Sequence, residues 1–243
     1  MHRVKAVALG ALLASSVTGH AHAQSLRVSP VTIDLPPAAK SAVLNVGNDS
    51  DKPIAVQARV FRWTQAGGED KLERTDVVAV SPPLLSVGGK SSGIVRVVRV
   101  GQTPVTGEES YRVLLDEVPD RSRMQAGTVV LALRDSVPVF FHGMDALRGD
   151  VRWSVSSSGN KLFLQAANPG QKRIKLSGLH VTDGAVRKLI SIEGLAGYVL
   201  GGQTKTWELP VPKSGLNAGT TLSIEATSEA GPINASATVG KSG

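Results

Sequence analysis

The stretch that decides the fold is Gly127-Thr-Val-Val-Leu-Ala-Leu-Arg-Asp-Ser-Val-Pro-Val-Phe-Phe141. Its apolar residues recur at every second position, which is the period of a β-strand with one apolar face. That face carries Val129, Leu131, Leu133, Val137, Val139 and Phe141, interrupted only by Asp135. Because proline cannot donate a hydrogen bond to a neighbouring strand, Pro138 favours a sheet edge, a strand end or a bulge. The stretch therefore predicts a long edge strand.

The same period of two recurs along most of the chain, and strong helical periodicity is absent. The expected strands are 26–34, 41–46, 54–63, 77–80, 93–100, 111–118, 129–141, 151–155, 161–166, 173–181, 186–192, 204–209, 221–225 and 235–239. An immunoglobulin-like sandwich uses about seven strands in about 100 residues. The sequence therefore predicts an all-β fold of two tandem immunoglobulin-like sandwiches, residues 24–143 and 149–243, divided at the segment Gly143–Gly149.

The first 23 residues have the layout of a secretory signal peptide. Arg3 and Lys5 make a basic start, residues 6–17 are apolar, and Ala21-His-Ala23 is an A-x-A cleavage site. We expect cleavage after residue 23 and export of the remaining chain. No apolar run reaches the roughly 20 residues that a membrane-spanning helix needs.

Composition excludes several classes of function. The chain has 243 residues, of which 41% are hydrophobic, and no cysteine, so thiol catalysis, disulfides and cysteine-ligated metals are excluded. Its formal charge is +7, and removing the two basic residues of the predicted signal peptide gives +7 − 2 = +5. We do not expect a nucleic-acid partner, because the charge is moderate and clusters of basic and aromatic residues are missing.

Motifs for catalysis are also missing. Beyond residue 23 the only histidines are His142 and His180, and neither has other metal ligands at a suitable spacing. The segment Gly88–Ser91 lacks the earlier glycine of a phosphate-binding loop, because position 84 is leucine. Neither a nucleophile elbow nor a dinucleotide fingerprint occurs. We expect no enzyme activity, no metal and no cofactor.

The predicted edge strand is the most informative feature for function. A long apolar edge with little charge promotes aggregation unless something covers it. A protein that adds one of its strands to the sheet of a partner needs such an edge. The alternative is an ordinary edge strand that faces its own core, which alternation alone does not exclude.

A series of motifs extends through the chain after the signal peptide. They are Val28-Ser-Pro-Val-Thr-Ile33, Val46-Gly-Asn-Asp49, Ser81-Pro-Pro83, Gly88-Gly-Lys90 with Val95-Arg-Val97, Tyr111-Arg-Val-Leu-Leu-Asp-Glu-Val-Pro119, Ser136-Val-Pro-Val-Phe140 and Ala167-Asn-Pro-Gly170. In this order and spacing the chain resembles the periplasmic chaperones that assemble pili through the chaperone–usher pathway of Gram-negative bacteria.

The resemblance implies a periplasmic boomerang of two immunoglobulin-like domains. In that family the last strand of the first domain fills a groove in an incomplete pilin until the next subunit replaces it, and an outer-membrane usher receives the complex. By motif position Val129, Leu131 and Leu133 correspond to the groove-filling residues, and Val137 and Val139 continue the same face. The same edge could also pair with a second copy of the chain.

The sequence departs from the family pattern at the site that binds the C-terminal carboxylate of the pilin. Motif alignment puts Thr32 where the best-known branch has arginine and Pro138 where it has lysine, so the resemblance is to a divergent branch. Arg112 is the candidate replacement, because a hairpin closed by residues 119–127 would place it near position 134. Lys172 and Arg173 could supply a second charge from the other domain, or could be exposed loop residues.

Two further residues match an internal ion pair that the family has near its hinge. They are Arg96 and Glu117, and the third member, an acid in the second domain, is replaced near Asn217. We expect their role to be structural. The alternative for the whole chain is a secreted immunoglobulin-like protein that binds a surface or a carbohydrate. A pilin is disfavoured, because pilins have a single incomplete domain.

Overall fold

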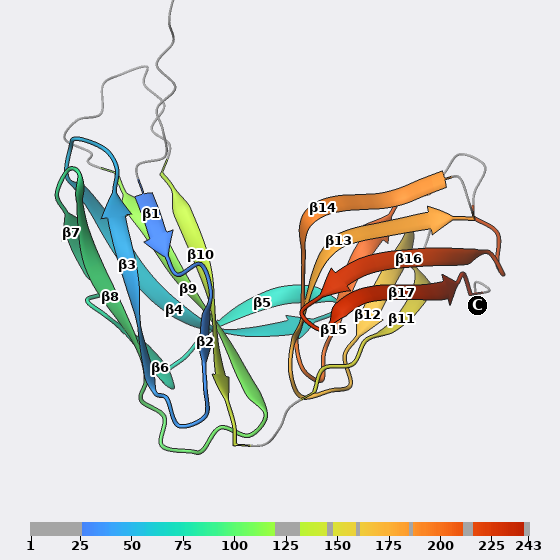
Figure 1. Ribbon diagram of the computed structural model, residues 1–243, viewed down its shortest axis with the longest axis horizontal. Helices are drawn as coiled ribbons and strands as arrows, with labels where there is room; N and C mark the ends of the chain where they lie inside the picture. The colour runs from blue at the N-terminus through green and yellow to red at the C-terminus, as the bar shows by residue number, and fades with distance from the viewer. Residues whose placement is uncertain are drawn as a thin grey trace, which may run out of the picture.

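The structure is a computed structural model that describes residues 26–119, 132–144, 148–158, 161–184, 187–210 and 216–240. These residues form strands β1 to β17, arranged in four sheets. The sheets pack in pairs into two sandwiches that meet at an angle, in the shape of a boomerang (Figure 1). The predicted all-β architecture is confirmed. Within the described ranges, no helix is long and apolar enough to cross a membrane.

The N-terminal sandwich contains β1 to β10. One sheet has the order β1 (Leu26–Ser29), β3 (Ser41–Asn48), β8 (Ser91–Arg99), β6 (Val78–Ser81). The other has the order β2 (Ile33–Leu35), β10 (Arg134–His142), β9 (Glu108–Val118), β4 (Ile54–Ala66), β5 (Glu69–Arg74), with β7 (Leu84–Val87) also beside β4. Alternate residues of both sheets fill the core between them, among them Leu44, Val95, Tyr111, Val113 and Phe141.

The C-terminal sandwich contains β11 to β17. Its smaller sheet has the order β11 (Arg152–Ser158), β12 (Lys161–Ala167), β15 (Thr204–Leu209). Its larger sheet has the order β14 (Arg187–Val199), β13 (Ile174–Asp183), β16 (Thr221–Ser228), β17 (Gly231–Thr238). This sandwich has a core of its own, separate from the first. The predicted boundary at residues 143–149 is compatible with the two cores and stays a prediction.

The first predicted strand, 26–34, is divided in the structure. β1 pairs antiparallel with β3, and the chain then crosses to the opposite sheet, where β2 pairs parallel with β10. β7 and β5 were not predicted. β5 has a single apolar residue, Leu72, so the alternating pattern does not reveal it. It forms a hairpin with β4 through Gly67 and Gly68, whose φ angles of 63° and 82° favour glycine.

Each sandwich has a turn built around a buried asparagine. In the N-terminal sandwich the side-chain nitrogen of Asn48 donates to the carbonyl oxygen of Lys52 at 2.7 Å. In the C-terminal sandwich Asn168 donates to the carbonyl oxygen of Lys172, also at 2.7 Å. In both turns the side-chain oxygen accepts from the backbone N–H two residues further on. The second turn ends next to Arg173, so its hydrogen bonds fix the backbone position from which the Arg173 side chain extends.

Candidate functional site

Strand β10 is paired differently along its two halves. It pairs with β9 over its whole length, but β2 covers the opposite edge only at Val139, Phe140 and Phe141. Residues 134–138 therefore have an edge that no strand of the described ranges covers. The predicted edge strand is present, and only its first half is open.

The register determines which backbone groups this open edge offers. The N–H of Glu117 donates to the carbonyl oxygen of Leu133 at 2.9 Å. Because hydrogen-bonded and non-hydrogen-bonded pairs alternate in an antiparallel ladder, Arg134, Ser136 and Pro138 direct their backbone groups away from β9. Pro138 thus lacks its N–H on the open side, and the pairing with β9 continues through it.

A groove runs beside the open edge. It has a volume of about 350 Å³ and lies between β10 on one side and β1, the loop after β1 and the end of β3 on the other. Its lining residues are Leu26, Arg27, Val28, Val31, Asp49, Asp135, Ser136 and Val137. Val31 is 76% exposed. Desolvation by burial raises the pKa of Asp135. The groove is therefore accessible, and its lining combines apolar side chains with the charged residues Arg27, Asp49 and Asp135.

The predicted groove-filling residues divide into three groups. Val129 and Leu131 lie outside the described residues. Leu133 is half-buried and packs against the core of its own domain. Val137 and Val139 are 3% and 0% exposed within that core, so the prediction that they enter a partner is wrong. The period of two identifies which residues share the apolar face of a strand. It does not indicate how much of that face is covered by the second sheet of the same domain.

Arg112 lies in the cleft between the two domains, although its register differs from the prediction. It is opposite Pro138 rather than position 134. Opposite residues of antiparallel strands share a face, so Arg112 is beside the position where the resemblance expects lysine. Its guanidinium carbon lies 3.8 Å from the ring centre of Trp63 and 5.9 Å from that of Tyr198 in the C-terminal domain.

The surroundings of Arg112 favour an anion. Desolvation by burial lowers its pKa, and the charge of Asp70 opposes this effect. Among the described residues, no carboxylate forms an ion pair with Arg112. A half-buried cation without an ion-pair partner binds an anion that is brought into the cleft more strongly than a cation in water does.

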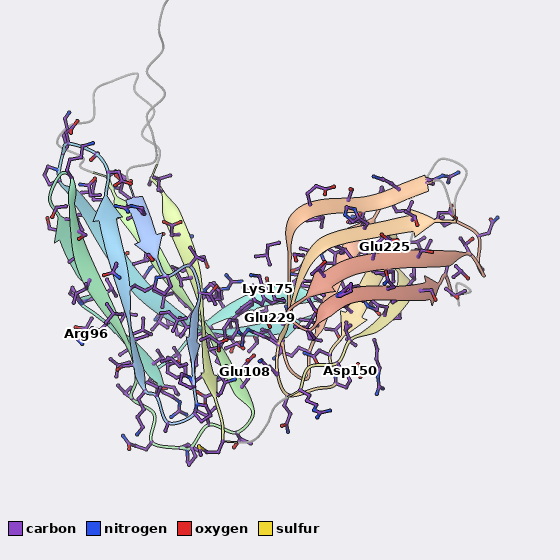
Figure 2. The ribbon with its side chains drawn as sticks, in the orientation of Figure 1. Arg96, Glu108, Asp150, Lys175, Glu225 and Glu229 are labelled. Carbon is purple, nitrogen blue, oxygen red and sulfur yellow. The ribbon has the colours of Figure 1, made fainter. Side chains whose placement is uncertain are left out.

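Arg173 has a different role from the predicted one. It is buried and forms ion pairs with Glu108 and, at 2.7 Å, with Asp34, both in the N-terminal domain. Its guanidinium carbon lies 3.6 Å above the ring of Phe140. Figure 2 shows Glu108 at the junction of the two domains. The charge of Arg173 is thus neutralised by acids of its own chain. Lys172 borders a cavity that Arg173 also lines.

His142 completes this ionic contact, because it lies against Asp34 and its Nδ1 is 3.6 Å from Glu108. Burial of Asp34 raises its pKa, but hydrogen bonds from His142 and Arg173 outweigh burial, and the net shift is downward. The described residues contain no group of three His, Asp or Glu side chains that could hold a metal ion. The cluster is therefore an interdomain ionic contact.

The predicted ion pair between Arg96 and Glu117 is wrong. Arg96 is exposed on the outer face of β8, whereas Glu117 is on β9 in the other sheet, and Figure 2 shows Arg96 on the flank remote from the C-terminal domain. The buried arginine of β8 is Arg99, which forms two hydrogen bonds of 2.8 Å with Glu109. The alternation of Val95 and Val97 with Arg99 is the sequence signal that would have identified it.

A second interdomain contact comes from the β4–β5 hairpin and was missed in the sequence. The side-chain amide of Gln65 donates to the carbonyl oxygen of Tyr198 at 2.7 Å and accepts from the N–H of Leu200 at 3.0 Å. The N–H of Thr206 donates to the carbonyl oxygen of Gly68 at 3.0 Å. A Cβ atom at Gly68 would lie 2.3 Å from the Thr206 side chain, so this close approach requires glycine.

Comparison with known proteins agrees with this arrangement. Residues 25–144 match the family model described as pili and flagellar-assembly chaperone, PapD N-terminal domain. The chain is 28% identical over 193 residues to the chaperone protein AfaB of Escherichia coli, covering 71% of this chain and 74% of that protein.

Solved structures share the fold. A chain of the CsuC–CsuE chaperone–tip adhesion subunit complex from the archaic Csu pili of Acinetobacter baumannii has a TM-score of 0.68 and 22% identity, covering 88% of this chain and 98% of that one. The E. coli chaperone DraB has a TM-score of 0.55 and 22% identity, covering 87% and 98%. The chain therefore belongs to the PapD-like family of periplasmic pilus-assembly chaperones, which are not enzymes.

Proposed function

We propose that this chaperone captures pilin subunits by adding the first half of β10, and the residues before it, to the incomplete sheet of the subunit. The open edge of residues 134–138 is the observation that supports this proposal. The chain is exported by cleavage after residue 23 and delivers its subunit to an outer-membrane usher.

Val129, Leu131 and Leu133 are the side chains that would enter the subunit. Burying a fully exposed side chain of this kind contributes about 1.5–3 kcal/mol. Leu133 is already half-buried and contributes less, so the three together contribute less than about 9 kcal/mol before the losses of association. Backbone hydrogen bonds along Arg134 and Ser136 add register more than net free energy. The complex is thus stable enough to hold a subunit and weak enough to be replaced by another strand.

Arg112 would bind the C-terminal carboxylate of the subunit. It is beside Pro138, on the cleft side of the sheet, and has no ion-pair partner among the described residues. A carboxylate placed there would satisfy the guanidinium and would itself avoid burial without a counter-charge.

The main experiment replaces Leu131 with glutamate. We expect Leu131→Glu to abolish recovery of a co-expressed pilin subunit, because a charge would enter an apolar groove. The matched control is Ala132→Glu, the same change one residue later on the opposite face, which should leave recovery unchanged. Equal recovery with both variants would contradict the assignment, and binding to glycan with normal Leu131→Glu behaviour would favour the surface-binding alternative.

The second experiment tests the carboxylate site. Arg112→Ala should weaken binding of the subunit by about tenfold or more, because a buried carboxylate would lose its cation. Arg152→Ala removes an exposed arginine of the C-terminal domain and is the control. Similar affinities for the two variants would place the anchor elsewhere.

The open edge also suits pairing with a second copy when no subunit is present. Under that proposal the free chaperone forms concentration-dependent dimers on gel filtration, and Leu131→Glu or a bound subunit reduces them. A free protein that stays monomeric at all concentrations would contradict it.

A further inference from the structure

Three arginines of β4, β9 and β10 lie on the same face of the larger N-terminal sheet. Arg134 is opposite Asp116, Arg59 is opposite Leu114, and Arg112 lies on β9 two residues before Leu114, in the next row. We name Arg59, Arg112 and Arg134 the arginine ladder. Because a strand rises about 3.4 Å per residue, successive rows are about 7 Å apart.

This face of the sheet is the one that borders the cleft. Val137 and Val139 point into the core, so the residues between them point the other way. At the inner end of the face, the rings of Phe140 and Tyr198 of the C-terminal domain are 5.7 Å apart. Arg134 is the first residue of β10, and Figure 1 shows the beginning of this strand away from the C-terminal domain. The arginine ladder therefore lies further out on the same face than Phe140.

The arginine ladder carries more positive charge than its surroundings neutralise. Asp116 pairs with Arg59 at 2.6 Å and also with Arg134, and these hydrogen bonds lower its pKa against the effect of burial. Asp70, on the neighbouring β5, pairs with Lys205 of the C-terminal domain at 3.3 Å. Asp116 is thus the single described carboxylate that forms ion pairs with the ladder, and the charge of Asp70 acts on Arg112 without an ion pair.

Hydrogen-bond donors of the arginine ladder are also unused. The Nε of Arg59 is buried and has no hydrogen-bond partner among the described residues. Arg112 forms no ion pair within the same ranges, and its Nη1 donates only a long hydrogen bond, of 3.5 Å, to the carbonyl oxygen of Ser136. The Arg59 and Arg134 side chains are nevertheless accessible, at 41% and 59% exposure. Donors that are fixed in place and lack acceptors favour an anionic partner.

We propose that the arginine ladder is a docking surface for an acidic segment of the captured pilin subunit. This inference rests on the proposed function and adds the chemistry of the partner. Alternate side chains of an extended segment are also about 7 Å apart, so carboxylates at every second residue match the rows of the ladder. A subunit with such a segment binds faster and in one orientation, because the charges steer the encounter.

The test compares two double variants that remove equal charge. Arg59→Gln/Arg134→Gln should bind a pilin subunit encoded beside this chaperone about tenfold more weakly at low salt, and the difference should shrink at high salt. Arg96→Gln/Arg152→Gln removes two exposed arginines outside the cleft and should bind like the wild type. Thermal unfolding of both variants verifies that they fold.

The outcomes separate this inference from the proposed function. If the wild type captures the subunit and Leu131→Glu does not, but the two double variants bind equally, the arginine ladder is not a docking surface and the proposed function stands. If the wild type captures no subunit, the proposed function fails. Replacing the alternate acids of the subunit with amides should abolish the difference between the double variants, and a persisting difference would overturn the inference.

Discussion

The two halves of β10 have opposite surroundings within one strand. Residues 139–141 have strands on both edges, the N-terminal core on one face and the C-terminal domain on the other. Residues 134–138 have a strand on one edge only and border a groove. The contacts of residues 139–141 stabilise the fold, whereas the open edge of residues 134–138 leaves backbone hydrogen-bonding groups for a partner. A single strand can therefore contribute to stability at one end and to binding at the other.

The largest effect on stability should come from the covered half. Phe141 is 1% exposed and its ring meets that of Tyr111 edge-on at 5.8 Å. Phe141→Ala should lower the free energy of unfolding by about 3–5 kcal/mol, measured by urea denaturation. Ser136→Ala, in the open half, is the control and should change it little. Comparable losses for both would remove the distinction between the halves.

The next effect concerns the ionic contact on the covered half. Arg173→Ala leaves the buried carboxylate of Glu108 without its cation, which should destabilise the protein by about 3 kcal/mol. Small-angle scattering should also show a wider range of angles between the domains. The control is Arg152→Ala, which removes an exposed arginine and should change neither the stability nor the range of angles. If Arg173→Ala behaves like Arg152→Ala, the prediction is contradicted.

The pH dependence should have opposite signs for Asp34, which lies on β2 beside the covered half, and for Asp135, which lies in the open half. The folded pKa of Asp34 is lowered, so its contribution to stability is present above its ordinary pKa of 3.8 and is lost as pH falls below that value. The folded pKa of Asp135 is raised, so it reduces stability as pH rises through that range. At neutral pH, Asp34→Asn should destabilise the protein and Asp135→Asn should stabilise it. Unfolding at pH 7 and at acid pH measures both, and equal signs would contradict the prediction.

The smallest effect should come from Pro138. Because its nitrogen faces the open edge, Pro138→Ala adds a donor there without changing the ladder to β9. The free energy of unfolding should therefore change by less than about 1 kcal/mol. A larger gain in stability would mean that the nitrogen faces β9.

The sequence predicted the strands with strong alternation and the fold class, because a period of two reports burial on one face. It did not predict β5, whose residues are exposed, or the change of sheet between β1 and β2. These features depend on contacts with distant segments, which a local pattern does not contain. The tight turn at Gly67 and Gly68 could be recognised in the sequence, but the hydrogen bond between Thr206 and Gly68 could not.

The candidate site was predicted in part. The edge at Pro138 followed from one property of proline, and Arg112 was identified as a cleft cation although its register was wrong. The register could not be obtained from strand limits alone, because a hairpin with a long loop can close at several positions. Arg173 was not separable from an exposed loop residue, since its partners Asp34 and Glu108 are far away in sequence.

The amide of Gln65 imitates a strand backbone, giving one hydrogen bond and receiving another across the junction. Hydrogen bonds of this kind are directional, so they hold the two arms of the boomerang at a set opening before any subunit arrives. A subunit must therefore fit the preset angle between the two domains in its thickness as well as in its chemistry. The chaperone therefore selects a subunit by its shape in the same step in which it supplies the missing strand.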